Sequence, residues 1–265
     1  MPTAPIDDIQ LHYEVHGQGD PLMLVAGLAS DSQSWQPILD ELSSHRSVIV
    51  FDNRGVGRTP PSGTDMTIRL MADDCIALAR HLGLSSFSLL GHSMGGYIAQ
   101  DCAARYPQFI DRLILAGTAT RTSNRNIALF SDWTTCLETG MDPEIWFRNI
   151  FFWVFAPRFF ENEAAVKEAI QFELEYPYPI DPSTFRKQVE AIAAFNGGET
   201  ASIAAPTLVI AGKEDLLMPP EEGLKLARII PGAAFRTIEH AAHSLFTENP
   251  KDFAAAVLDF LSKGK

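Results

Sequence analysis

The chain has 265 residues and a formal net charge of −12, with 21 Lys and Arg residues against 33 Asp and Glu residues. Hydrophobic residues make up 46% and charged residues 20%, a composition typical of a folded chain with a sizeable core and not of a disordered one. The length suits one large α/β domain or two small domains. The acidic excess repels phosphate backbones and anionic lipid surfaces, so neither nucleic acid nor a membrane is expected as a partner.

The first residues do not resemble a signal peptide, and the cysteines do not resemble a metal site. Residues 1–10 hold two aspartates and no basic residue, unlike a signal peptide, and the longest apolar run, residues 150–157, is too short to span a bilayer. A cytoplasmic location is therefore expected. The three cysteines, Cys75, Cys102 and Cys136, are odd in number and widely spaced, so we expect no disulfide framework and no zinc site.

Short apolar stretches predict the strands of one sheet. The first stretch, residues 9–16, alternates in character and ends at a Gly-rich turn. Continuous apolar runs of four to six residues follow, and runs of this kind are typical of strands buried on both faces of a parallel sheet. They lie at residues 22–25, 47–52, 87–90, 113–116 and 207–211, with a further strand-like stretch at 234–238.

Helical patterns lie between these strands. Over residues 67–82, apolar side chains recur at spacings of three and four and predict one helix, and residues 94–106 predict another. Asn249 followed by Pro250 is a typical helix start, and this helix is expected to reach about Ser262. Alternating strands and helices predict an α/β fold with a mostly parallel, doubly wound sheet.

One stretch, from about residue 121 to residue 200, contains no convincing strand. It is helix-like and rich in aromatic residues. We predict that residues 1–120 and 201–265 form the α/β core and that residues 121–200 form an inserted helical cap. The alternative is that the aromatic residues only fill a core, and a cap that packs on the sheet and faces a pocket would satisfy both interpretations.

The strongest chemical signal is the segment Gly91-His92-Ser93-Met94-Gly95. It follows a predicted buried strand and opens a predicted helix, which is the setting of a nucleophile elbow. In such a turn Ser93 would stand at the carboxyl edge of the sheet, where open α/β sheets place their active sites. The alternative is a serine in an ordinary Gly-rich turn.

These features resemble the α/β-hydrolase superfamily over nearly the whole chain. The family order of nucleophile, acid and base implies Asp215, in the loop after residues 207–211, as the acid. It implies His243, shortly before the helix start at Asn249, as the base. The resemblance thus implies the α/β-hydrolase fold and a catalytic triad of Ser93, Asp215 and His243.

The same loops contain rivals for these roles. His240 is the rival base and Glu214 the rival acid. His92 lies inside the elbow and is expected to have no catalytic role. A serine nucleophile also argues against the dehalogenases and epoxide hydrolases of the superfamily, which carry aspartate at the elbow.

A tetrahedral intermediate needs two hydrogen-bond donors for its oxyanion. The elbow offers the backbone N–H of Met94, and the family motif His-Gly-x maps the second donor to the backbone N–H of Leu28. The sequence departs from that motif because Ala26 stands where the family has histidine. The departure affects the support of the loop more than the donor, which is a backbone group.

A Gly-rich segment at residues 51–58 resembles the family's Asp-x-Arg-Gly-x-Gly stretch. A nucleotide site is the alternative, but no Gly-x-Gly-x-x-Gly or Walker pattern is present, so we predict a structural loop braced by Arg54. No cofactor and no metal is expected.

The overall pattern resembles the subgroup of 3-oxoadipate enol-lactonases and aminoacrylate-type hydrolases. It implies hydrolysis of a small carboxylic ester or lactone, so the expected partner is a small-molecule substrate. Alternatives that use the same triad are cofactor-free perhydrolysis, haloperoxidase-type chemistry, C–C bond hydrolysis and a slow ligand receptor. Five arginines of the predicted cap are candidates for a substrate carboxylate or, more simply, solvated surface charges: Arg121, Arg125, Arg148, Arg158 and Arg186.

Overall fold

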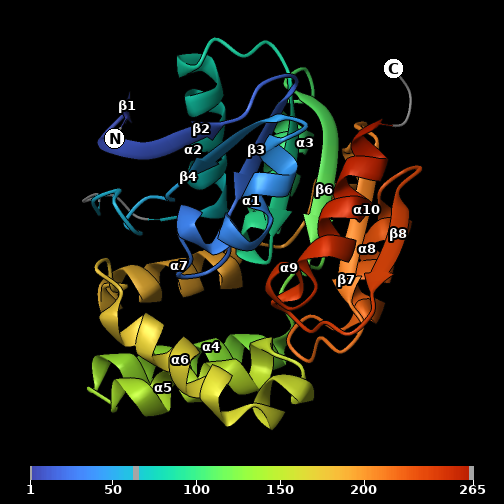
Figure 1. Cartoon of the computed structure of the whole chain (residues 1–265). Helices are drawn as coiled ribbons and strands as arrows, with labels where there is room; N and C mark the ends of the chain where they lie inside the picture. Colours follow the sequence, from blue (N-terminus) through green and yellow to red (C-terminus); the bar gives the residue numbers. More distant parts are fainter. Residues whose placement is uncertain (1, 62–65, 263–265) are drawn as a thin grey trace.

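The computed structural model describes residues 2–61 and 66–262. Its centre is an eight-stranded sheet in the order β1-β2-β4-β3-β5-β6-β7-β8 (Figure 1). The strands from β3 to β8 run parallel, and β1 and β2 pair antiparallel at one edge. The strands are β1 Thr3–Ile6, β2 Ile9–His16, β3 Pro21–Val25, β4 Ser47–Phe51, β5 Phe87–His92, β6 Ile110–Ala116, β7 Thr207–Gly212 and β8 Ala234–Ile238.

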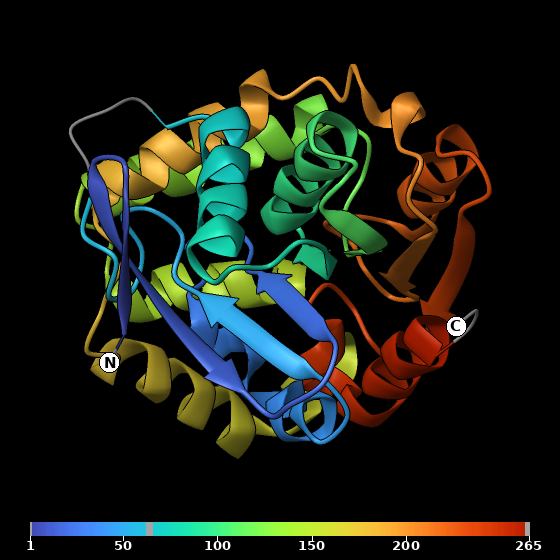
Figure 2. The same ribbon diagram turned by 90° about the horizontal axis from the view of Figure 1, so that it is seen from above.

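The mostly parallel sheet with helices on both faces confirms the predicted fold class. Strand β3 shows how the sequence produces it: Met23 and Val25 pack on one face, while Leu22 and Leu24 pack on the other. Side chains of successive strand residues point to opposite faces, so a continuous apolar run supplies both cores. Figure 2 shows α2 and α3 on one side of the strands and α1 and α10 on the other.

The helices of the core also follow from local sequence. In α2, the side chain of Thr67 caps the first turn by accepting a hydrogen bond from the N–H of Leu70 at 3.0 Å. Asn249 caps α10 as expected, accepting from the N–H of Asp252 at 3.4 Å. The core helices are α1 Gln36–Ser43, α2 Ile68–His81, α3 Met94–Arg105, α8 Pro220–Ile229, α9 Leu245–Glu248 and α10 Pro250–Ser262.

Four helices, here termed the cap helices, lie between β6 and β7 in the chain. Figure 1 shows them gathered at one end of the sheet. Each begins with a side chain that accepts hydrogen bonds from the first turn, which fixes where it starts. They are α4 Asn124–Glu138, α5 Pro143–Val154, α6 Glu163–Glu175 and α7 Pro182–Ala194, capped by Ser123, Asp142, Asn162 and Asp181. The division of the chain at residues 120 and 200 stays a prediction.

The loop after β4 is tied to α2 by a buried ion pair. Arg54 is fully buried and donates to both carboxylate oxygens of Asp74, at 2.7 Å each. A bidentate pair of this kind holds two charges in a fixed geometry away from water. Arg54 therefore braces the loop, as the sequence predicted.

Four of the described strands and α-helices were not predicted: β1, α1, α8 and α9. Each is short or lies at an edge of the fold, where a few apolar residues give little periodicity. None of the described helices has the length and apolar character needed to cross a membrane. All three cysteines have free thiols; Cys75 and Cys102 are buried, and Cys136 is partly exposed.

Candidate active site

Ser93 stands on the sharp turn between β5 and α3. Its φ of 55° and ψ of −117° are unusual for a residue with a side chain. The turn depends on two glycines: a Cβ on Gly91 would lie 2.2 Å from the carbonyl oxygen of Gly95, and one on Gly95 would lie 2.1 Å from that of Val25. The elbow therefore tolerates no side chain at either position, and its strain presents Ser93 at the end of the strand.

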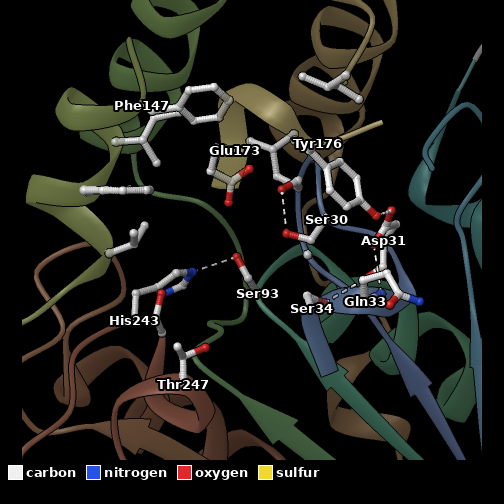
Figure 3. A pocket seen from close by; sticks show the side chains of 18 of the residues that line it. Ser30, Asp31, Gln33, Ser34, Ser93, Phe147, Glu173, Tyr176, His243 and Thr247 are labelled. Atoms are coloured by element: carbon white, nitrogen blue, oxygen red, sulfur yellow. Dashed lines mark hydrogen bonds between the residues drawn. The ribbon is translucent and has the colours of Figure 1, made fainter. Parts of the chain in front are cut away.

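Three side chains from separate loops form one hydrogen-bonded chain, and Figure 3 shows the contact between two of them, Ser93 and His243. The Oγ of Ser93 lies 3.0 Å from Nε2 of His243, and Nδ1 of His243 lies 2.8 Å from Oδ2 of Asp215. All three residues are buried: Ser93 is 8% exposed, His243 4% and Asp215 2%. When Nδ1–H donates to the carboxylate, Nε2 has a free lone pair for the serine proton. This is the geometry of a nucleophile, a general base and an orienting acid.

The carboxylate of Asp215 is fixed from two sides. Its second oxygen, Oδ1, accepts hydrogen bonds from the backbone N–H groups of Leu217 at 2.8 Å and Met218 at 2.7 Å. With the bond to His243, the carboxylate is held by three donors. Such a carboxylate can hold the imidazole in one tautomer and one orientation.

His92 supports the loop that carries His243. Its Nε2 lies 3.0 Å from the carbonyl oxygen of His243, an acceptor only, so this nitrogen carries the proton and donates. Burial, together with the neighbouring His243, lowers the pKa of His92 to about 3, so the ring is neutral at physiological pH. Trp35 and Phe246 pack against it edge-on. His92 thus acts on the position of His243 and not on the reacting atoms.

The rival residues lie outside this chain. His240 is exposed and adopts a φ of 59°, and Glu214 pairs with Arg158 of the cap segment. Neither makes a described hydrogen bond to Ser93 or His243. The structure therefore brings together Ser93, Asp215 and His243 and leaves both rivals apart.

The loop that carries Leu28 lies directly against the elbow. A Cβ on its neighbour Gly27 would be 3.2 Å from the Cβ of Ser93. The backbone N–H groups of Leu28 and Met94 donate to no other described residue, so both remain available to an oxyanion. At Ala26, the position that lacks the family histidine, the carbonyl oxygen accepts a hydrogen bond from Nδ2 of Asn53 at 3.2 Å.

The cap helices also hold this loop. Ala29 has a φ of 59°, in the left-handed region, and its N–H donates to Oε1 of Gln188 on α7 at 2.9 Å. Gln188 is fully buried. Nearby, the hydroxyl of Tyr176 donates to the carboxylate of Asp31, which begins the short helix after the loop. Two hydrogen bonds thus join the candidate oxyanion loop to the segment between β6 and β7.

The loop after β4 supports the same region from the core. Burial alone would raise the pKa of Asp52, but hydrogen bonds from Ser32 and Arg58 outweigh it and lower this pKa. Arg58 of this loop pairs with Asp52 within the loop and with Glu14 on β2. Among the described residues, no three His, Cys, Asp or Glu side chains are grouped as a metal ion would require.

Ser93 and His243 open into a cavity of about 520 Å³ between the sheet and the cap helices. No lysine or arginine lines it among the described residues. Arg125, Arg148, Arg158 and Arg186 instead bind other groups outside the cavity, and Arg121 is exposed. The walls are mainly aromatic and aliphatic, with Phe130, Trp133, Trp146, Phe147, Ile150, Phe151, Val154, Phe155, Phe172, Tyr176, Ile180 and Phe185 from the cap segment.

Two polar residues near this cavity were missed from sequence. On α6, Glu173 lies three positions after Ile170 and four after Ala169. On α7, Gln188 lies three positions after Phe185. Each thus interrupts the apolar face of an amphipathic helix. A polar residue at such a position was the available signal, because burial of a polar group needs a compensating partner.

The fold and this site define the class of protein. The sequence model described as the alpha/beta hydrolase fold matches residues 20–250, so the chain belongs to that family. It is 30% identical over 258 residues to an Agrobacterium fabrum protein named "Putative carbamate hydrolase RutD", covering 95% of this chain and 98% of that one. It is 28% identical to "Putative non-heme bromoperoxidase BpoC" of Mycobacterium tuberculosis, covering 97% and 99%.

Among solved structures, the chain is similar to the enol-lactonase from Burkholderia xenovorans LB400. The TM-score is 0.89 and the identity 27%, over 99% of this chain and 100% of that one. The predicted superfamily is therefore confirmed, and its relatives include an enol-lactonase. The chain is an α/β hydrolase.

Proposed function

We propose that the protein is a serine hydrolase that cleaves a small carboxylic ester or lactone through an acyl-enzyme intermediate. The Oγ of Ser93 attacks the carbonyl carbon while His243 takes the hydroxyl proton. The carbonyl oxygen becomes an oxyanion, which the N–H groups of Leu28 and Met94 stabilise. As the C–O bond to the leaving group breaks, His243 gives that proton to the departing alkoxide.

Water completes the cycle. His243 takes a proton from water, the hydroxide attacks the acyl carbon, and a second oxyanion forms at the same donors. The bond to Oγ of Ser93 then breaks, and His243 returns the proton to the serine. For a lactone the leaving alkoxide belongs to the same molecule, so the single product is a hydroxy acid.

The observation that carries this proposal is the Ser93–His243–Asp215 hydrogen-bonded chain at the wall of the cavity. The nucleophile and base are within 3.0 Å, and the base is oriented by a carboxylate with three donors. The names of the relatives agree with the bond type, because a carbamate and an enol-lactone each present a carbonyl carbon with a heteroatom leaving group. The cavity size suits a small substrate.

Stopped-flow hydrolysis of p-nitrophenyl acetate and butyrate tests the mechanism. We expect a burst of p-nitrophenol that matches the enzyme concentration where deacylation is slow, and turnover that falls by a factor on the order of 10⁴ in Ser93→Ala. A folded Ser93→Ala variant with full activity would overturn the proposal. Hydrolysis of γ- and δ-lactones, followed by acid release, then separates lactonase from esterase activity.

The similarity to the protein named a bromoperoxidase supports one second activity at the same site. Hydrogen peroxide in place of water would attack the acyl-enzyme, giving a peracid and free Ser93, and the peracid would oxidise bromide. Bromination of a phenol reporter in acetate buffer with peroxide measures this reaction. The activity is assigned only where bromination needs both acetate and Ser93.

A further inference from the structure

One acidic side chain of the cavity has no role in the proposed reaction. Glu173, on α6, is partly buried, and Figure 3 shows its carboxylate pointing into the cavity that Ser93 and His243 line from the opposite side. It comes from a cap helix, whereas the nucleophile and base come from loops of the sheet. A substrate that spans this cavity from Ser93 would therefore extend toward Glu173.

No described residue supplies a counter-charge to Glu173. No hydrogen bond or ion pair joins its carboxylate to another described residue. The nearest acidic neighbour, Asp31, is held by the hydroxyl of Tyr176 and offers Glu173 only repulsion. Burial first, and then the charge of Asp31, raise the pKa of Glu173 to about 6. Above that pH the cavity contains an unpaired negative charge, which costs free energy in the empty protein.

The rest of the cavity fits a cation. The described lining has no lysine or arginine, and two aromatic residues near Glu173 line the cavity: Phe172, which precedes it on α6, and Tyr176, directly after the end of that helix. Aromatic faces attract cations, and a carboxylate supplies the opposite charge. A substrate with its own carboxylate would instead be repelled by Glu173, for which no described residue supplies a counter-charge, and by Asp31, whose charge Arg58 offsets only in part.

We propose that Glu173 is a specificity-determining residue that binds an ammonium or similar cationic group of the substrate. The proposal deepens the proposed function, on which it rests: it names the substrate class as a small ester or lactone that carries a positive charge away from the reacting carbonyl. Glu173 touches the substrate but takes no part in bond making or breaking. Its effect is therefore expected in the choice among substrates.

Matched p-nitrophenyl esters test this assignment. The acyl chains of 6-aminohexanoate, heptanoate and pimelate differ at the far end by an ammonium, a methyl and a carboxylate group. For the alcohol side, the esters acetylcholine and 3,3-dimethylbutyl acetate have the same shape and differ in charge. In each set kcat/KM is measured at pH 8 for the wild type and for Glu173→Gln.

We expect the wild type to prefer the cationic ester in at least one set. Glu173→Gln should lower the ratio of kcat/KM for the cationic ester to that for its neutral isostere by about tenfold, mainly through KM. The variant should hydrolyse the pimelate ester faster than the wild type. Glu168→Gln, which removes an exposed carboxylate from the same helix, is the matched control and should leave every ratio unchanged.

The outcomes separate this inference from the mechanism. Equal kcat/KM of the wild type for charged and neutral esters would overturn the inference, and so would a preference for the cationic ester that persists in Glu173→Gln. In either case, turnover of the neutral ester leaves the proposed mechanism intact. A wild type that hydrolyses none of these esters would overturn the proposed function itself. Turnover of the neutral ester by Glu173→Gln shows that the variant is folded.

Discussion

Ser93 combines an unfavourable backbone conformation with a well-supported side chain. Its φ of 55° is held by a turn in which Gly91 and Gly95 allow backbone atoms to approach. Strain of this kind persists only where the surrounding structure imposes it. Ser93 could be named as the candidate nucleophile from the sequence because this turn requires glycines at fixed positions on either side of the serine.

Two histidines, His243 and His240, were candidates for the general base, and their different surroundings give a prediction. His243 is 4% exposed and contacts Ser93, whereas His240 is exposed. We expect His243→Ala to lower kcat for p-nitrophenyl butyrate by a factor on the order of 10⁴, and His240→Ala to change it less than about twofold. Steady-state kinetics on both folded variants check this. The reverse ranking would show that the base is His240.

Glu173 also predicts a pH dependence of stability. Its pKa of about 6 in the folded protein lies above its ordinary value of 4.5. The folded state therefore binds the proton more tightly than the unfolded state, and the stability from this group is lost as pH rises from about 4.5 through 6. Glu173→Gln removes that loss and should raise the free energy of unfolding at pH 8 by up to about 2 kcal/mol.

Urea unfolding at pH 8 and at pH 4 measures this difference. Near pH 4 the gain should disappear, because the carboxyl is then largely protonated in both states. Glu168→Gln serves as the control with the same change of charge at an exposed position. A gain of equal size at both pH values would argue against an ionised, unpaired Glu173.

At the scale of elements, buried strands were easier to predict than the short helices beside them. Strand β5 is apolar or small from Phe87 to Gly91 and buried throughout, and its pattern needs no partner to be recognised. Helix α1 has eight residues, of which only Ile38, Leu39 and Leu42 are buried. Its position depends on packing against α10, a contact between distant parts of the chain that no local pattern encodes.

The contact between α7 and the candidate oxyanion loop was likewise hidden from sequence. Gln188→Leu would remove the acceptor of the Ala29 N–H and keep a side chain of similar size. We expect kcat/KM for neutral esters to fall about tenfold or more, because the loop that carries Leu28 loses its support.

Thermal unfolding distinguishes this effect from a general loss of stability. The buried Nε2 of Gln188 has no hydrogen-bond partner among the described residues, so replacing the amide removes one unsatisfied group as it creates another at Ala29. The melting temperature should therefore change little in Gln188→Leu. Wild-type activity in this variant would show that the loop does not depend on α7.

At the scale of the whole molecule, the site lies where two parts of the chain meet. The candidate triad is built by loops at the end of the sheet, and the family order of nucleophile, acid and base named in advance the three residues that the structure brings together. The cavity opposite is built by the cap helices, and the charges that line it depend on which way each helix faces. The sequence offered five cap arginines as candidates for binding a substrate carboxylate, but the charged side chain that faces the cavity from α6 is Glu173.

Activation of Ser93 as a nucleophile is best tested by intact-protein mass spectrometry after reaction with a small fluorophosphonate. We expect a single adduct that peptide mapping places on Ser93, that disappears in Ser93→Ala, and that forms much more slowly in His243→Ala. A folded wild-type protein that gains no adduct, or gains it at another residue, would contradict this expectation.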